Sequence, residues 1–122
     1  MDYSSRLDPA TYVHEEPVGI AVAPASLLPG PLPNGLWSYV PEPLWQRLLS
    51  LGHAYNLHFA QVAEPVIDTV LESRQCQAFQ GELAFLSRVI SDPAVEQVLT
   101  LLQQQATRVS RDSSLRLIIS PP

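Results

Sequence analysis

The sequence contains no lysine, and all seven of its basic residues are arginines. This absence excludes a P-loop lysine, Schiff-base chemistry and a lysine nucleophile within these 122 residues. Twelve aspartates and glutamates give a net charge of −5, and the arginines form no basic cluster along the sequence. Because binding to phosphates requires concentrated positive charge, we expect no nucleic-acid partner.

Cysteine and long apolar runs are scarce as well. Cys76 is the only cysteine, so the chain cannot form an internal disulfide, and no neighbouring motif predicts a reactive thiol. Met1 to Pro9 contain no apolar segment of the signal-peptide type, and no run approaches the roughly 20 apolar residues of a membrane span. We therefore expect a cytoplasmic protein with no membrane partner.

The apolar content, 46% of the residues, is sufficient for one domain with a modest core. Residues 1–17 are polar, with Asp8-Pro9 and Glu16-Pro17 as breaks, and are predicted to form an N-terminal arm. Residues 18–122 are predicted to form a single helical domain with short strands near 18–23 and 115–120.

Proline is concentrated in one segment, since seven prolines lie from Pro17 to Pro43. This density is incompatible with a helix and favours extended or polyproline-like backbone, with Asn34-Gly35 as a turn. Apolar residues are interleaved with the prolines, so we expect an ordered segment that wraps the core. A proline-rich ligand for another protein is the alternative.

Helical periodicity begins at Pro43, which suits the first turn of a helix. Apolar residues at spacings of three and four predict a helix that runs to about Glu64. They are Leu44, Leu48, Leu51, Tyr55, Phe59 and Val62. Pro65 is expected to kink this helix or to open a second one. The apolar residues of that second helix are Val66, Ile67, Val70 and Leu71.

Two further amphipathic stretches follow a polar turn at residues 72–75. The first has Phe79, Leu83, Leu86 and Ile90 on one side. Asp92 can then cap the last helix while Pro93 occupies its first turn. The apolar seam of the last helix is expected to pack within a helical bundle rather than in a coiled-coil dimer. Its residues are Val95, Leu99, Leu102, Ala106 and Val109.

The chain closes with a strand-like run, Leu115–Ile119. Such a strand must pair with Val18–Val22, with another chain or with a further part of the protein, because it cannot satisfy its own backbone hydrogen bonds. The expected fold class is mainly α (α+β), with three to four helices packed with a minimal two-stranded sheet and a proline-rich wrapping segment. Alternate residues of the two strands form a possible association edge: Val18, Ile20, Val22, Leu115, Leu117 and Ile119.

No catalytic, cofactor-binding or metal-binding constellation stands out in the sequence. His53 and His58 are five residues apart, which does not place them on one helix face, and no further ligand lies at a suitable spacing. We expect surface or hydrogen-bonded histidines. Glu64, Asp68 and Glu72 follow one another at spacings of four, which fits either a solvated face or a docking surface for a basic partner.

Three segments occur in a characteristic order along the chain: Val22-Ala23-Pro24-Ala25-Ser26-Leu27-Leu28-Pro29, Pro41-Glu42-Pro43-Leu44-Trp45 and Tyr55-Asn56-Leu57-His58-Phe59. With the helices and closing strand that follow, this order resembles the N-terminal region of eukaryotic-type glutathione synthetases over about residues 18–120. Members of that family are ATP-grasp ligases that join γ-glutamylcysteine to glycine with ATP and magnesium. Their early strand takes part in a homodimer contact.

The chain departs from the family after its closing strand. The family has an Arg-Ser-Asp-Tyr run there, whose arginine holds substrate, whereas this sequence has Pro121-Pro122. No family active-site residue can be assigned, and no cofactor is expected in this chain. Two hypotheses result: a non-catalytic N-terminal part of a glutathione-synthetase-like ligase, whose full-length form would use ATP and magnesium, and a free-standing interaction module of the adaptor or immunity type. Both imply a protein partner or a homodimer.

Overall fold

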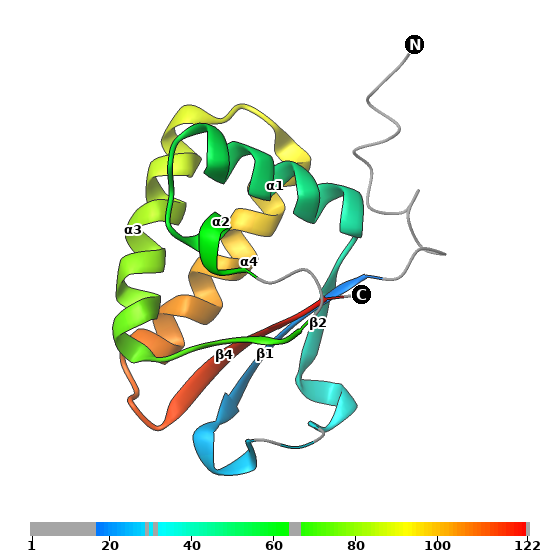
Figure 1. Ribbon diagram of the computed structural model, residues 1–122, viewed down its shortest axis with the longest axis vertical. Coiled ribbons are helices and arrows are strands. Elements are labelled where there is room, and N and C mark those ends of the chain that lie inside the picture. Colours follow the sequence, from blue (N-terminus) through cyan, green and yellow to red (C-terminus); the bar gives the residue numbers. More distant parts are fainter. Residues whose placement is uncertain (1–16, 29, 31, 64–66, 122) are drawn as a thin grey trace.

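In the computed structural model, the residues that the structure describes form four α-helices packed on one face of a four-stranded antiparallel sheet (Figure 1). The structure describes residues 17–28, 30, 32–63 and 67–121. The elements are β1 (Val18–Pro24), the 3₁₀ turns η3 (Ala25–Leu27) and η4 (Asn34–Leu36), β2 (Trp37–Val40), α1 (Glu42–Ala54), α2 (Phe59–Val62), β3 (Thr69–Leu71), α3 (Ser73–Val89), α4 (Pro93–Ser110) and β4 (Leu115–Ser120).

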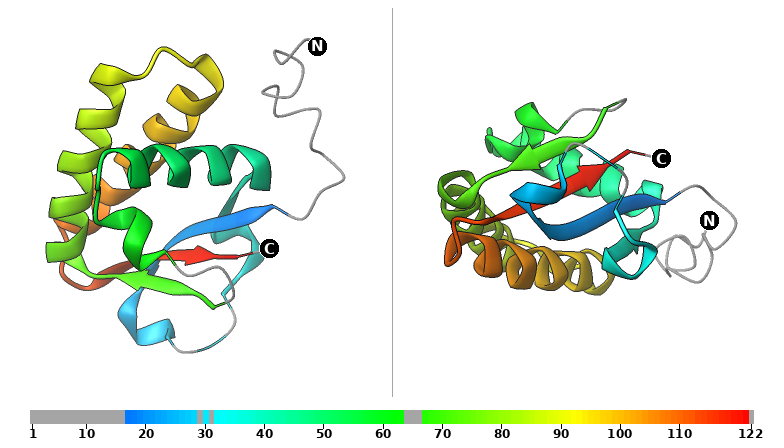
Figure 2. Two further views of the ribbon diagram at one scale, coloured as in Figure 1. Left: turned by 45° about the horizontal axis from the view of Figure 1, so that its top comes forward. Right: turned by 90° about the horizontal axis from the view of Figure 1, so that it is seen from below.

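The expected two-stranded sheet is wrong, because the described part of the chain forms a sheet of four strands in the order β2-β1-β4-β3. They lie side by side in the right-hand view of Figure 2. The two unexpected strands are the edges, and both are short: β2 lies within the predicted wrapping segment and β3 within the predicted second helix. Three or four residues are too few to show a period of two, so neither strand could be separated from its neighbours by pattern. Val66 lies outside the described residues.

β4 pairs with β1, which is the first of the three alternatives that its sequence allowed. The register places Ile20 opposite Ile119 and Val22 opposite Leu117. β2 pairs with the other side of β1, and β3 with the other side of β4. The two central strands therefore come from opposite ends of the described chain.

The core lies between the sheet and the helices and contains the two apolar faces predicted for α3 and α4. Phe79, Leu83 and Leu86 are buried on α3, whereas Ile90 packs against the core while partly exposed. All five seam residues of α4 are buried. Asp92 caps α4 as predicted: its Oδ1 accepts hydrogen bonds from the backbone N–H groups of Ala94 at 3.1 Å and Val95 at 3.4 Å.

The first long helix ends earlier than predicted, since α1 stops at Ala54 rather than near Glu64. Asn56 adopts a left-handed conformation, with φ of 56°. The Leu57 N–H donates to the Gly52 carbonyl at 2.8 Å, and the Asn56 N–H donates to the His53 carbonyl at 3.1 Å. These two bonds form a Schellman termination. The apolar spacing of the sequence continues beyond the end of α1 because Phe59, in α2, packs into the same core as the apolar residues of α1.

The proline-rich segment forms the two 3₁₀ turns and β2 rather than one extended wrap. In Figure 1 the turns lie on the side of the sheet away from the helices. Ala21, Ala23 and Ile118 alternate with the core positions of their strands and are also buried. The Ala25 N–H donates to the Ser114 carbonyl at 2.8 Å, which ties the start of η3 to the turn before β4.

Candidate functional site

The described residues bring together no group of three or more histidine, cysteine, aspartate or glutamate side chains that could hold a metal ion. His53 lies exposed on α1, and His58 lies exposed just before α2. Cys76 is fully buried on α3, and burial raises the pKa of its thiol to about 11. A thiol in this state is a poor nucleophile at neutral pH.

The acidic residues at spacings of four do not share one helix. Asp68 precedes β3 and accepts a hydrogen bond from the Ser120 hydroxyl at 2.8 Å. Glu72 is the N-cap of α3 in a reciprocal capping box, in which the Gln75 side chain accepts from the Glu72 N–H at 2.9 Å. Glu64 lies outside the described residues.

The six residues of the predicted association edge lie in the two central strands: Val18, Ile20 and Val22 in β1, and Leu115, Leu117 and Ile119 in β4. Both strands are paired on both sides. Five of the six side chains are buried, and Leu115 packs against the same core. Within the described sheet, the edges open to another chain belong instead to β2 and β3.

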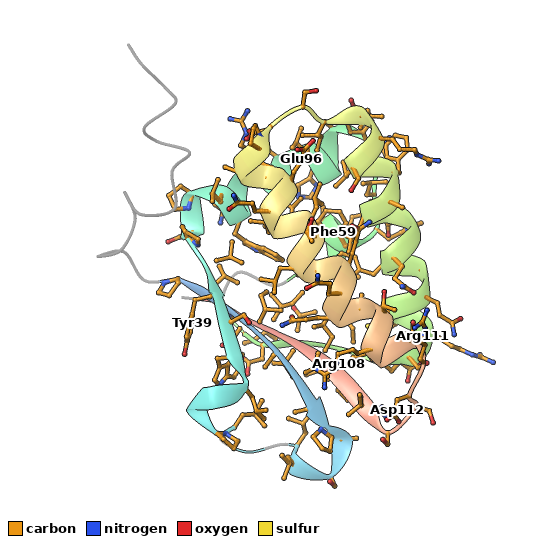
Figure 3. All side chains as sticks on the ribbon, turned by 180° about the vertical axis from the view of Figure 1, so that it is seen from behind. Tyr39, Phe59, Glu96, Arg108, Arg111 and Asp112 are labelled. Carbon is orange, nitrogen blue, oxygen red and sulfur yellow. The ribbon has the colours of Figure 1, made fainter. Side chains whose placement is uncertain are left out.

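β2 presents two aromatic side chains at a sheet edge. Trp37 and Tyr39 alternate with the inward residues of the strand, and the Tyr39 side chain is 59% exposed. Figure 3 shows Tyr39 projecting beyond the edge of the sheet. An open hollow of about 170 Å³ lies beside them. Its lining is Pro17, Gly19, Trp37, Tyr39, Ser120 and Pro121.

Gly19 holds the Trp37 ring close to the sheet. A Cβ built on Gly19 would lie 2.9 Å from Cε3 of Trp37, closer than real contacts allow. The indole therefore occupies the space that a side chain on β1 would need. We call the surface formed by Gly19, Trp37 and Tyr39 the β2 aromatic edge.

A second concavity lies between α2 and α3, and we call it the α2–α3 pocket. It has a volume of about 110 Å³ and a mostly apolar lining. Its lining residues are His58, Phe59, Val62, Leu71, Gln75, Ala78, Phe79 and Glu82. The Phe59 and Phe79 rings lie 5.4 Å apart. Nδ1 of His58 lies 3.9 Å from Oε1 of Glu82.

Two further hollows lie on the surface of the described residues, and both have mixed polar and apolar linings. One, of about 300 Å³, lies against α1 and the end of β4, and its polar lining residues are Glu42, Gln46 and His53. The other is a wide depression of about 550 Å³ near the start of α3, with Arg74 and Arg116 on its rim. Arg116 is engaged there, because its Nη1 donates to the carbonyls of Ser113 and Leu115, each at 2.8 Å.

Further charged groups gather at the end of α4. Figure 3 shows Arg108, Arg111 and Asp112 there. Oδ1 of Asp112 accepts from the Ser114 hydroxyl at 2.6 Å and from the Ser114 N–H at 3.0 Å, and these bonds lower the pKa of the Asp112 carboxyl. This arrangement serves the turn into β4.

Comparison with protein-family models, with curated proteins and with solved structures gave no match. Among the described helices, none combines the length and apolar character needed to cross a membrane. The surfaces themselves are therefore the basis for any assignment of function.

Proposed function

We propose that this chain is a non-catalytic protein-interaction module that associates through the β2 aromatic edge. The observation that carries the proposal is the exposed Tyr39 on an edge strand that contains no charged residue. Natural proteins commonly protect such edges with lysine, other charges, proline or a bulge. β2 has the sequence Trp-Ser-Tyr-Val and is followed by Pro41, so its protection consists of its length of four residues and the proline at its end.

Apolar exposure supports this side of the molecule as the binding surface. Tyr39 is accompanied there by Leu36, which immediately precedes β2 and is 36% exposed. Exposed apolar side chains that gather beside an unpaired edge are typical of association sites rather than of solvated surface. The hollow beside Trp37 supplies a concave feature for a partner side chain.

A second copy of the chain is the partner that fits this edge most simply. Pairing two β2 strands antiparallel, with Ser38 opposite Ser38, keeps the helices of both copies on one face of a continuous sheet. Trp37 of each copy then lies opposite Tyr39 of the other, on the side away from the helices. Aromatic cross-strand pairs of this kind stabilise antiparallel sheets. We therefore propose a homodimer with a continuous eight-stranded sheet.

Sedimentation velocity over a range of protein concentrations tests the proposal. We expect the mass of a dimer for the unmodified chain and of a monomer for Tyr39→Lys, because lysine on an edge strand opposes pairing. Val89→Lys is the matched control, since Val89 is 45% exposed on α3, away from the sheet edge. A monomeric mass for the unmodified chain at every concentration, or equal dissociation of both variants, would contradict the proposal.

The resemblance to the N-terminal region of glutathione synthetases remains a second proposal, in which this chain is a non-catalytic part of a longer ATP-grasp ligase. It predicts no nucleotide site within these residues. Isothermal titration of the chain with Mg-ATP and with γ-glutamylcysteine should therefore give no saturable heat. Saturable nucleotide binding would instead indicate an enzyme and would overturn the non-catalytic assignment in both proposals.

A further inference from the structure

We infer that the α2–α3 pocket receives a long basic side chain, lysine or arginine, from a partner protein. This inference rests on the proposed interaction function and extends it, because it identifies a second contact surface and the chemistry of the group that fills it. The pocket lies on the helical side of the molecule and shares no lining residue with the β2 aromatic edge.

The shape of the pocket follows α3. Gln75, Ala78, Phe79 and Glu82 line it, and these positions fall on one face of that helix. Seven residues of α-helix rise by about 10 Å, so the pocket is a slot with Gln75 toward one end and Glu82 toward the other. Phe59 and Val62 from α2 form the opposing wall. The slot is therefore long, narrow and apolar along its length.

The Glu82 carboxylate lies at one end of the slot. The Glu82 side chain is only 14% exposed, and its Oε2 atom is shielded from solvent with no hydrogen-bond donor among the residues that the structure describes. The His58 side chain, by contrast, is 88% exposed and lies 3.9 Å from the other carboxylate oxygen, too far for a hydrogen bond. A buried carboxylate oxygen without a donor is unfavourable, so a donor that enters the slot gains a strong interaction.

A long basic side chain matches both properties. Lysine and arginine pack an aliphatic stem along apolar surface while a cationic head reaches an acceptor. In this slot the stem would lie against Phe59 and Phe79 while the head donates to the Glu82 carboxylate, whose shielded Oε2 would reach the head through rotation of the Glu82 side chain toward the slot. The net charge of −5 also favours the approach of a basic partner. Because these 122 residues contain no lysine, a lysine in the slot would have to come from outside them.

Amide chemical shifts measured by NMR during titration with short peptides test the inference. The probes are acetyl-Gly-Lys-Gly-amide, its arginine counterpart, and an uncharged counterpart with norleucine. We expect saturable shifts at Phe59, Phe79 and Glu82 with the basic peptides, and affinity about tenfold lower for norleucine, as expected for loss of one charge-assisted hydrogen bond.

Glu82→Gln should lower the affinity for the basic peptides by about tenfold, because the amide loses the charge that attracts the cation. Glu96→Gln is the matched control, since Glu96 is exposed in the first turn of α4 and does not line the slot. That variant should bind like the unmodified chain. Retention of native amide dispersion in both variants confirms that each is folded.

The absence of saturable shifts with both basic peptides would overturn the inference. Equal affinity for the norleucine peptide, or no loss of affinity in Glu82→Gln, would overturn it too, because binding would then not depend on the carboxylate. The two proposals fail separately: Glu82→Gln should keep the dimeric mass, whereas Tyr39→Lys should keep the affinity for the basic peptides.

Discussion

Cys76 links burial to the pH dependence of stability. Its thiol keeps its proton to about pH 11 in the folded chain, whereas an unfolded chain ionises cysteine at about 8.5. Folded protein therefore binds more protons between these values, so the free energy of unfolding falls as pH rises from about 9 to about 11. We expect Cys76→Ala to show a shallower decline in urea unfolding over this range. An equal decline of the free energy of unfolding with pH in the unmodified chain and in Cys76→Ala would contradict the burial of the thiol.

Asp92 combines two interactions on one carboxylate. Oδ1 caps α4, and Oδ2 lies 2.8 Å from Nε of Arg47. Because the Arg47 side chain is 51% exposed, we expect the ion pair to contribute little and the cap to dominate. Asp92→Ala should lower the free energy of unfolding by about 1–2 kcal/mol, whereas Asp92→Asn, which retains the cap, should lower it by less than about 1 kcal/mol. Urea unfolding measures both. If Asp92→Asn lowered the free energy of unfolding as much as Asp92→Ala does, the ion pair and not the cap would be the source of the stabilisation.

At the scale of elements, α1 and α2 pack closely together at Gly52. A Cβ on Gly52 would lie 2.8 Å from Cβ of Ala60 and 2.8 Å from Cζ of Phe59. Gly52→Ala should therefore destabilise the fold by about 1–2 kcal/mol, because overpacking exceeds the gain in helix propensity. Thermal unfolding measures the change.

Gly81 is the matched control for that substitution. It lies exposed within α3, and a Cβ there would meet nothing within 4 Å. Gly81→Ala should raise the free energy of unfolding by about 0.5–1 kcal/mol through helix propensity alone. Loss of stability in both variants would mean that the tight contact of α1 with α2 is not the cause.

The elements that sequence predicted well are those with local signals. α4 has a capping aspartate, a proline in its first turn and a five-residue apolar seam, and all of these are observed. β2 and β3 lack such signals, since each is held by neighbours distant in sequence rather than by its own pattern. The end of α1 was hidden because an asparagine, rather than a glycine, adopts the left-handed conformation.

The candidate surfaces were missed for a related reason. Trp37 and Tyr39 alternate in the sequence after Asn34-Gly35, a faint strand signal that the surrounding prolines obscured. Glu82 lies between the buried apolar positions Phe79 and Leu83 of α3. A charged residue next to the apolar face of a helix was therefore the one feature of the sequence that could have indicated this pocket. Its burial depends on α2, whose position follows from the turn at Asn56 and is not encoded near Glu82.

At the scale of the whole molecule, net charge opposes the proposed dimer. Each copy carries a charge of −5, so two copies repel each other at long range. Salt screens this repulsion, and we expect the dissociation constant of the dimer to fall by several-fold between about 0.01 M and 1 M ionic strength. Sedimentation equilibrium at several salt concentrations measures it. A dissociation constant that rises with salt would indicate ion pairs across the interface instead.

The pairing of β1 with β4 determines how the fold should respond to mechanical force. Gly19 and Ser120 are opposite each other at one end of this antiparallel pair. A pulling force applied at these two positions acts across the strands, along the direction of the hydrogen bonds that join them. Those bonds would then break one after another, as in a zipper, instead of sharing the load. The sheet should therefore yield at low force when stretched from these two points, even though its central strands are the most deeply buried.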